Sequence, residues 1–428
     1  MRVLVTNAWS PQAYFVVLGL RPYAEWIVAA PDRRSCFVAY SKYVDVRYAV
    51  PAPSVDFSFG RLQDSNTKAE QDYLEAILNI CAKENIDTIV PSNEPDIYVL
   101  SKNKRTLNDL GIVVTVPDFD KLLLLVDKAE TLRLARKHGI PCPRTILFGE
   151  ETDVLSQAKE IGPPWIIKPR SDSHGTGMAI VTDPAQLRET LAFVAKYYKD
   201  PLIQELVPGA EKQNFYVILD SEGKAKFVHC PKIVRYCRRL YRNSTAAALS
   251  RTEHPWLPQV KRFVEALGMR GALTVQTKID ARDGLPKLME INVGIRTNDW
   301  YWDALGINSP LLCTRIERNE DDLDVAAIPS DVMLLDPIGD FVNLGTELAD
   351  WAVFSVRRPI LRKQPADPLN TPPSPAKIAL AYFENYLGGH KKAFCPMFKH
   401  MPSDPKPNLL GSLMLARSAV RNLRKVGY

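Results

Sequence analysis

Short apolar runs alternate with amphipathic helical stretches along the first part of the chain. The run RVLVTNA at residues 2–8 predicts a buried strand, and a helical pattern follows it from Pro11 to Leu20. The run EWIVAAP and a helical period over residues 66–85 repeat the arrangement, and DTIVPSNE and GIVVTVPD add two further strands. This alternation predicts a small doubly wound α/β domain over residues 1–118.

Mixed helices and antiparallel hairpins are predicted for the next part of the chain, residues 119–327. NFYVILDSEGKAKFVHC indicates a hairpin that turns at Asp220–Gly223, and GALTVQTKIDARDGLPKLMEIN indicates a second that turns near Asp283–Gly284. We therefore expect one α+β domain here. Its small lid subdomain would span about 145–207 and its large subdomain about 208–310.

The second hairpin carries polar residues at strand spacing. A period of two assigns these side chains to one face of each strand: Gln276, Lys278 and Asp280 on the first, and Leu288, Glu290 and Asn292 on the second. If both polar faces lie on one side of the hairpin, Gln276, Glu290 and Asn292 converge. One carboxylate and two amide oxygens form a hard-oxygen set that suits Mg²⁺. The alternative is an amphipathic hairpin with a solvated face.

Two further segments have features of a phosphate or nucleotide site. In IIKPRSDSHGTGM, Lys168 ends an apolar strand, and a loop containing Gly175 and Gly177 can cover a phosphate with backbone N–H groups. Alternatively these are ordinary turn glycines, and the segment is not a Walker loop. In QELVPGAE, residues 204–211, the strand end can present backbone groups to an adenine edge, or the strand simply runs into a turn.

The order of these motifs, DK…GIP, IIKP…GTGM, QELVPGAE and GALTVQTKID…KLMEIN, resembles the ATP-grasp superfamily. Biotin carboxylase and the large chain of carbamoyl phosphate synthase are the nearest types. The resemblance covers residues 1 to about 310. It implies an ATP-grasp fold behind a small α/β domain, and it leaves residues 328–428 as a basic C-terminal extension.

The resemblance also implies roles for individual residues. Nucleotide contacts are implied for Lys128 and Lys168 at the phosphates, for Ser173, Gly175, Thr176 and Gly177 in the covering loop, for Glu205, Leu206 and Val207 at the adenine, and for Glu211 near the ribose. Metal ligands are implied for Gln276, Glu290 and Asn292, with Mg²⁺ as the ion and Mn²⁺ as an alternative. Gln276 stands where many members carry an acid, but the carbamoyl phosphate synthases resemble this chain in using Gln there. The usual EINPR is EINVGIR here, so Arg296 is the candidate for the displaced arginine.

The implied reaction is that of a carboxylate–amine ligase. ATP would convert a carboxylate to an acyl phosphate, and an amine would displace the phosphate, with both substrates amino acid-like. Arg296 and Arg235 are candidate catalytic cations. Arg235, Arg238 and Arg242 have helical spacing and can clamp an anion, or they form a solvated basic helix face. Two alternatives stay open: an inactive nucleotide-binding scaffold, and a carboxylase or kinase variant.

The composition is that of an ordinary globular protein. The distribution of charge along the chain is the one compositional feature that bears on possible partners. Of its 428 residues 46% are apolar and 24% charged, and the net charge is +6. Residues 351–428 hold 13 Lys and Arg against 3 Asp and Glu, which leaves 42 basic and 46 acidic residues elsewhere. A body of that sign argues against nucleic acid as a partner.

The basic tail and the cysteines complete the expectations. Residues 364–377 read as a Pro-rich linker, and the terminal stretch has an apolar stripe beside arginines, typical either of peripheral membrane contact or of packing on the protein. The scattered cysteines predict reduced thiols in a cytoplasmic protein, because no spacing suggests zinc and no signal peptide or membrane span is apparent. A homodimer is one arrangement open to it.

Overall fold

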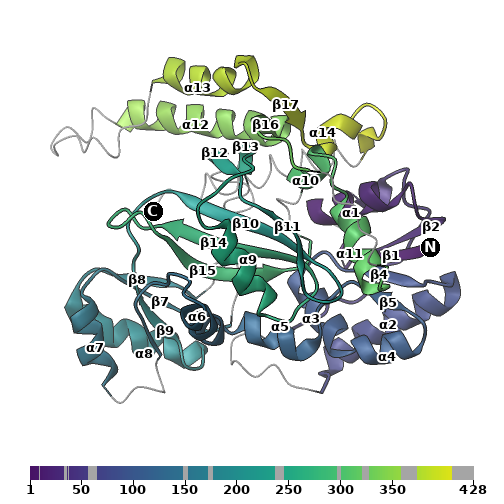
Figure 1. Cartoon of the computed structure of the whole chain (residues 1–428), viewed down its shortest axis with the longest axis horizontal. Coiled ribbons are helices and arrows are strands. Elements are labelled where there is room, and N and C mark those ends of the chain that lie inside the picture. Colours follow the sequence, from purple (N-terminus) through teal and green to yellow (C-terminus); the bar gives the residue numbers. More distant parts are fainter. Residues whose placement is uncertain are drawn as a thin grey trace. The chain divides into compact units, whose positions relative to one another are not determined.

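The structure is a computed structural model of the 428-residue chain, shown as a ribbon in Figure 1. It describes residues 1–8, 10–32, 36, 38–55, 65–147, 153–171, 177–236, 245–295, 300–320, 327–357 and 374–406. The chain forms two compact units. Unit 1 comprises Met1–Cys230, Glu253–Asp299 and Asn308–Ala326, and unit 2 comprises Pro231–Thr252, Trp300–Ile307 and Ala327–Tyr428.

Unit 1 begins with a parallel sheet of order β3-β2-β1-β4-β5. Its strands are β1 (Arg2–Thr6), β2 (Trp26–Ala30), β3 (Val46–Arg47), β4 (Thr88–Val90) and β5 (Val113–Val114). The connecting helices are α1 (Pro11–Leu20), η1 (Val38–Tyr40), α2 (Lys68–Glu84), α3 (Glu94–Lys102) and α4 (Lys104–Asp109). The predicted α/β domain is therefore confirmed.

Local signals fix where these helices start. Ser10 caps α1, and its Oγ accepts the Ala13 N–H. Thr67 and Glu70 form a reciprocal capping box at α2. Each cap satisfies backbone N–H groups that have no partner in the first turn, so the helix begins at a defined residue.

A second, antiparallel sheet of order β6-β9-β7-β8 lies in the predicted lid segment of unit 1. Helices α5 (Phe119–Val126) and α6 (Lys128–Lys137) precede it, and the segment contains β6 (Thr145–Leu147), α7 (Val154–Ile161), β7 (Trp165–Lys168), β8 (Ala179–Val181), η2 (Pro184–Gln186), α8 (Leu187–Tyr197) and β9 (Leu202–Glu205). Its small core includes Trp165 and Ile167 from β7 and Leu191 from α8.

The third sheet of unit 1 is antiparallel, with order β11-β10-β14-β15. Its strands are β10 (Lys212–Leu219), β11 (Ala225–His229), β14 (Gly271–Ile279) and β15 (Pro286–Val293), accompanied by α9 (Leu257–Glu265) and α11 (Ser309–Glu317). Phe215, Val275 and Ile291 belong to the main core of the unit. Both predicted hairpins are confirmed, since β10 pairs with β11 and β14 pairs with β15.

Unit 2 is built around a sheet of order β12-β13-β16-β17. Its elements are β12 (Lys232–Tyr236), β13 (Thr245–Leu249), α10 (Trp300–Ala304), β16 (Val332–Leu335), α12 (Pro337–Arg357), α13 (Pro375–Leu387), β17 (Lys391–Phe394) and α14 (Pro396–His400). Figure 1 shows α12 and α13 side by side. The sheet joins strands from distant parts of the sequence, so unit 2 needs both its middle and its C-terminal segments.

Two sequence expectations for unit 2 are corrected. The stretch with helical arginine spacing starts as a strand, because Lys232–Tyr236 pairs with β13 and β13 in turn pairs with β16. The Pro-rich linker predicted for 364–377 ends earlier, because Ser374 caps α13 and Pro375 occupies its first turn. The rest of that linker, Arg238 and Arg242, and the basic stretch after residue 406 lie outside the described residues.

The remaining global expectations concern membranes and thiols. Among the described residues, no helix is both long and apolar enough to cross a bilayer. Within the same residues, no disulfide bond links the cysteines. The redox state of the thiols stays a prediction. The cytoplasmic location, the peripheral membrane contact, the homodimer and the domain boundaries stay predictions.

Candidate functional site

One face of the large sheet in unit 1 is polar, opposite the face that packs into the core. The register aligns Lys212 and Asn214 of β10, Gln276 and Lys278 of β14, and Glu290 and Asn292 of β15 on this face. Gln276 lies directly opposite Glu290, and Asn292 Nδ2 donates to Glu290 Oε1 at 3.4 Å. The structure therefore brings together Gln276, Glu290 and Asn292, as the sequence predicts, and their part in metal binding stays a prediction.

Two other residues predicted for this face do not lie on it: a β-bulge turns Leu288 to the other side, and Asp280 follows the end of β14. The register of β14 and β15 shifts between Gln276 and Thr277, so Thr277 pairs with Leu288. Leu288 consequently faces the core, where it is fully buried, rather than the side of Glu290. Asp280 lies beyond the end of β14, and its fully buried carboxylate accepts hydrogen bonds from Arg282 at 2.9 and 2.6 Å.

Lys128 and Lys168, 40 positions apart in the sequence, are held near each other by the chain around them. Lys168 is the last residue of β7, and Lys128 is the first residue of α6. The Lys128 N–H donates to the Arg170 carbonyl at 3.0 Å. The Arg170 guanidinium donates to Asp127, the N-cap of α6, at 2.8 Å. These bonds tie the start of α6 to the end of β7.

Several lysines cluster around the Glu290 carboxylate. Burial and the neighbouring Lys128 together lower the pKa of Lys168 to about 8, although Glu290 partly offsets them. Burial and Lys278 likewise lower the pKa of Lys212, again against Glu290. A buried excess of cationic groups is unfavourable unless an anion joins them. The arrangement therefore suits a polyanion such as a phosphate chain.

Sequence reasoning missed Lys212. It directly follows Glu211 and lies opposite Lys278 in the register of β10 and β14. The start of β10 is three polar residues in a row, Lys212–Asn214, so its own pattern does not say which side chain faces the site, and only the pairing to β14 does. That pairing joins segments more than 60 positions apart, so β10 alone could not reveal it.

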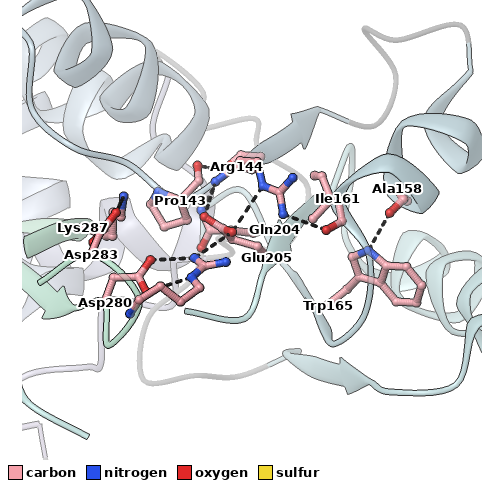
Figure 2. Close-up of polar contacts among 12 residues, drawn as sticks. Pro143, Arg144, Ala158, Ile161, Trp165, Gln204, Glu205, Asp280, Asp283 and Lys287 are labelled. Carbon is pink, nitrogen blue, oxygen red and sulfur yellow. Dashed lines mark hydrogen bonds and ion pairs between the residues drawn. The ribbon is translucent and has the colours of Figure 1, made fainter. Parts of the chain in front are cut away.

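Glu205 forms a polar cluster between the lid sheet and the turn after β14, which we call the Glu205 cluster (Arg144, Glu205, Asp280 and Arg282). Its carboxylate accepts the Arg144 backbone N–H at 2.9 Å and Arg282 Nη2 at 2.9 Å. Figure 2 shows Glu205 between Arg144 and the side of the cluster that holds Asp280. Burial opposes ionisation, yet these donors hold the pKa of Glu205 below its ordinary value. The Glu205 side chain is thus committed to protein contacts.

Only main-chain groups are therefore left for the adenine contacts predicted at Glu205, Leu206 and Val207. The Leu206 N–H already donates to the Pro164 carbonyl at 3.0 Å, and Lys278 Nζ donates to the Val207 carbonyl at 2.6 Å. The Val207 N–H has no hydrogen-bond partner within the described part of the chain. A contact of this N–H with an adenine edge stays a prediction.

Of the other predicted site residues, Glu211 and Gly177 are described by the structure and the rest are not. Glu211 is exposed, and its carboxylate accepts Gln213 Nε2 at 3.2 Å. Gly177 has a φ of +70°, and a Cβ there would lie 2.4 Å from Tyr198 Cε2, so only glycine fits. The candidates Ser173, Gly175, Thr176 and Arg296 lie outside the described residues.

Arg235 belongs to unit 2, where its guanidinium pairs with a buried carboxylate. It donates to Asp340 through Nε at 2.6 Å and Nη2 at 2.7 Å. The guanidinium carbon also lies 3.8 Å from the centroid of the Tyr382 ring, and the Tyr386 hydroxyl donates to Asp340 at 2.9 Å. This geometry gives Arg235 a packing role in unit 2, and its catalytic role stays a prediction.

The donor set near Glu290 fits magnesium better than a transition metal. Among the described residues no group of three or more His, Cys, Asp or Glu side chains is arranged to hold a metal ion. Mg²⁺ retains water and takes few protein ligands together with substrate phosphates, so one carboxylate with amide oxygens suffices. Glu290, Asn292 and Gln276 provide this set.

Comparisons with known proteins agree with this architecture. Residues 125–298 match the family model described as an ATP-grasp domain, and residues 62–115 match the PylC-like N-terminal domain. A D-alanine–D-alanine ligase of Albidiferax ferrireducens is 26% identical over 241 residues, which cover 52% of this chain and 68% of the ligase. The same type of ligase from Acidovorax ebreus is 27% identical over 223 residues, covering 48% and 67%.

Solved structures show the same fold at low sequence identity. A biotin carboxylase from Campylobacter jejuni, described as a complex with β,γ-ATP, superimposes with a TM-score of 0.59 at 15% identity, covering 78% of this chain and 74% of that one. The biotin carboxylase domain dimer of a Hydrogenobacter thermophilus 2-oxoglutarate carboxylase, with MgADP, ADP and bicarbonate, gives 0.61 at 17% identity, covering 78% and 73%.

Proposed function

This chain contains an ATP-grasp domain, and we propose that it is an ATP-dependent ligase that joins a carboxylate to an amine and releases ADP and phosphate. ATP-grasp enzymes use ATP and Mg²⁺, so the cofactor prediction is confirmed for the domain. The observation that carries the proposal is geometric: hydrogen bonds tie the start of α6 at Lys128 to the end of β7 at Lys168, and the register places Glu290 beside Gln276 on the polar face of the large sheet. Cations and a metal-binding acid beside one another suit a magnesium-bound triphosphate.

In the first step, a carboxylate oxygen of the acid substrate attacks the γ-phosphorus of ATP. The bond from that phosphorus to the β–γ bridging oxygen breaks, ADP leaves, and an acyl phosphate is formed. Lys128 and Lys168 would offset the charge on the transferring group, while Glu290, Asn292 and Gln276 would hold the metal. Mg²⁺ supplies positive charge to the phosphate oxygens when it is bound. Catalysis here consists mainly of positioning and electrostatic stabilisation.

In the second step, the amine nitrogen attacks the acyl carbon and loses a proton. Phosphate leaves as the carbon–nitrogen bond forms. A cation beside the acyl oxygen would stabilise the tetrahedral oxyanion, and Arg296 is our candidate by sequence position. We propose amino acid-like substrates for both parts, because the matched curated relatives are named as ligases of two alanines.

Glu290→Gln tests the metal assignment with little change of shape. We expect full-length protein to bind ATP in a magnesium-dependent way by calorimetry, and to release ADP when pools of amino acids and small carboxylates are supplied. Because the variant loses the only carboxylate of the proposed metal set, ADP release should fall at least about 100-fold. Glu222→Gln, at an exposed turn of the same sheet, is the matched control.

The products decide between the proposal and its alternatives. Mass spectrometry of an amide that forms together with ADP supports the ligase. ATP binding without turnover in any pool would favour a scaffold, and ADP release without an amide would favour a carboxylase or kinase variant. Unchanged ADP release by Glu290→Gln would remove the metal assignment.

A further inference from the structure

Helix α12 of unit 2 buries polar residues and exposes apolar ones, the reverse of an ordinary surface helix. Asp340, Asn343 and Thr346 are buried, whereas Phe341 is 78% exposed. Positions 341, 345, 348 and 352 follow at helical spacing on the side opposite the buried polar residues, and they are Phe, Gly, Leu and Ala. None of the four carries a charge, so the outer side of α12 is apolar.

Helix α13, which lies beside α12, exposes an apolar stripe of its own (Figure 1). Leu380, Phe383 and Leu387 have the spacing of one helix face and are 58%, 56% and 80% exposed. Single exposed apolar residues are ordinary, but neighbouring ones on two adjacent helices form a patch of the kind that marks an interaction site.

One buried polar cluster fixes the orientation of both helices. Asp340 of α12 accepts hydrogen bonds from Arg235 of β12 and, at 2.9 Å, from the Tyr386 hydroxyl of α13. Tyr382 of α13 is also buried, with its ring against the Arg235 guanidinium. Rotation of either helix to hide its apolar side would break these contacts. The exposure of that side is therefore built into the fold of unit 2.

Lysines stand at both ends of the apolar stripe of α13. Lys377 is exposed in the first turn of the helix. At the other end, Lys392 Nζ donates to the carbonyls of Gly388 and His390 at 2.9 and 3.2 Å, directly after Leu387. Long lysine side chains can keep their ammonium groups at a polar boundary while the residues between them enter an apolar phase.

The exposed charges of unit 2 are mainly positive. Among its described side chains of this kind, lysines outnumber acids by six to two: Lys232, Lys377, Lys391, Lys392, Lys399 and Lys406 against Asp331 and Glu384. A second copy of the chain would bring like charges together around the apolar patch, which is unfavourable. An apolar surface with positive surroundings instead complements an anionic lipid surface.

We propose that unit 2 docks on an anionic lipid bilayer through this exposed apolar surface. We call the surface the α12–α13 face (Phe341, Leu348, Leu380, Phe383 and Leu387). Its side chains would enter the boundary between headgroups and acyl chains, and the neighbouring lysines would meet lipid phosphates. The surface belongs to unit 2, whereas the residues proposed to bind ATP belong to unit 1, so the inference does not depend on the proposed ligase activity.

Co-sedimentation with lipid vesicles tests the docking. Full-length protein is mixed with vesicles of phosphatidylcholine alone, or of equal parts phosphatidylcholine and phosphatidylglycerol. We expect binding to the anionic vesicles, weakened by added salt. Leu380→Gln with Leu387→Gln should lower the partition coefficient at least about tenfold, because two apolar side chains no longer leave water. Leu110→Gln, at an exposed leucine of unit 1, is the matched control.

Two further variants examine the other helix and the charges. Phe341→Gln on α12 should also weaken binding, which keeps the test valid if the leucine variant folds poorly. Lys391→Gln with Lys392→Gln should weaken binding to the anionic vesicles about tenfold or more. Lys196→Gln with Lys199→Gln, at exposed lysines of unit 1, should leave it unchanged.

The outcomes decide what covers the α12–α13 face. Native protein that does not sediment with anionic vesicles overturns the proposal. Vesicle binding that survives in both apolar variants also overturns it, because charge elsewhere would then hold the protein on lipid. Light scattering without lipid tests the competing occupant: a native dimer that ignores vesicles and dissociates in the leucine variant assigns the face to a second copy. ATP binding should be unchanged in every variant, so failure of the docking leaves the ligase proposal standing.

Discussion

At the scale of a single residue, the burial of the Lys168 charge destabilises the fold, whereas the proposed contact with phosphate needs that charge. Its side chain is buried beside Lys128, and among the described residues the Glu290 carboxylate favours its charged form. Without a nucleotide, this buried cation lowers the stability of the fold, because burial penalises the charged form. A bound phosphate would relieve the penalty. Natural proteins accept such local costs where a charge is needed for binding.

The pH dependence of stability should reveal this cost. The pKa of Lys168 is about 8 in the fold and near 10.5 when unfolded, so the folded chain releases the proton first as pH rises. Between those values the unfolded state binds more protons, and the stability of the nucleotide-free chain increases with pH. Lys168→Met should therefore be more stable at pH 7, by up to about 3 kcal/mol, with the difference shrinking towards pH 10.

Urea unfolding across pH 6–10 measures this effect. Lys196→Met, at an exposed position of α8, is the control. The difference between its free energy of unfolding and that of the native chain should not change with pH. ATP binding should be lost in Lys168→Met and kept in Lys196→Met. A Lys168→Met variant that is less stable than the native chain at every pH would contradict the account.

At the scale of elements, the Glu205 cluster joins two sheets of unit 1. Glu205 ends β9 of the lid sheet, and Asp280 and Arg282 lie in the turn between β14 and β15. Arg282 bridges the two acids, and its guanidinium lowers the pKa of Asp280 to about 2. The main-chain groups of residues 205–207 follow directly on this cluster. Its geometry therefore fixes the segment that we expect to meet adenine.

Arg282→Ala should loosen this junction. The Arg282 side chain is 49% exposed, whereas Asp280 is fully buried. The free energy of unfolding should therefore fall by about 1–2 kcal/mol, between the values for exposed and buried ion pairs. The KM for ATP should also rise. Arg188→Ala, on α8 and exposed, serves as the control. Unchanged stability together with unchanged KM would show that the cluster does not position the segment.

The sequence predicted elements better than it predicted their details. The periods of two and 3.6 correctly indicated the hairpins and α1, because one buried face imposes that pattern on a strand or helix. The bulge after Gln276 could not be foreseen, since no glycine or proline marks it and the partner strand decides which residue slips. Strand β12 was mistaken for a helix because arginines at helical spacing carry no information about the partner β13.

At the scale of the whole molecule, the C-terminal segment contributes strands to a sheet whose other strands come from the middle of the sequence. Residues 328–428 were predicted to be an extension, yet β16 pairs with β13, and β13 pairs with β12. Unit 2 is therefore assembled across gaps in the sequence, and local patterns do not report such pairings. Candidate site residues of unit 1 could be proposed from the sequence, because motifs with fixed order fall on Lys128, Lys168 and Glu290, and their roles stay predictions.

Arg235 provides the test of how unit 2 is held together. Its side chain is 10% exposed and that of Asp340 is 4% exposed, so their bidentate pair is nearly dry. Removal of one partner leaves the other charge buried alone, and Arg235→Ala should lower the free energy of unfolding of unit 2 by about 3–5 kcal/mol. Replacement of both, by Arg235→Met with Asp340→Leu, should restore much of that loss, because no unpaired charge remains.

Calorimetric unfolding and limited proteolysis report the stability of unit 2, with exposed Arg262→Ala on α9 of unit 1 as the control. A purely catalytic Arg235 predicts the opposite pattern: native stability with lost turnover in Arg235→Ala, and no recovery of turnover in the double variant. If the double variant regains both stability and ADP release, Arg235 acts through packing. The cation at the acyl phosphate must then be sought elsewhere, with Arg296 the first candidate to test.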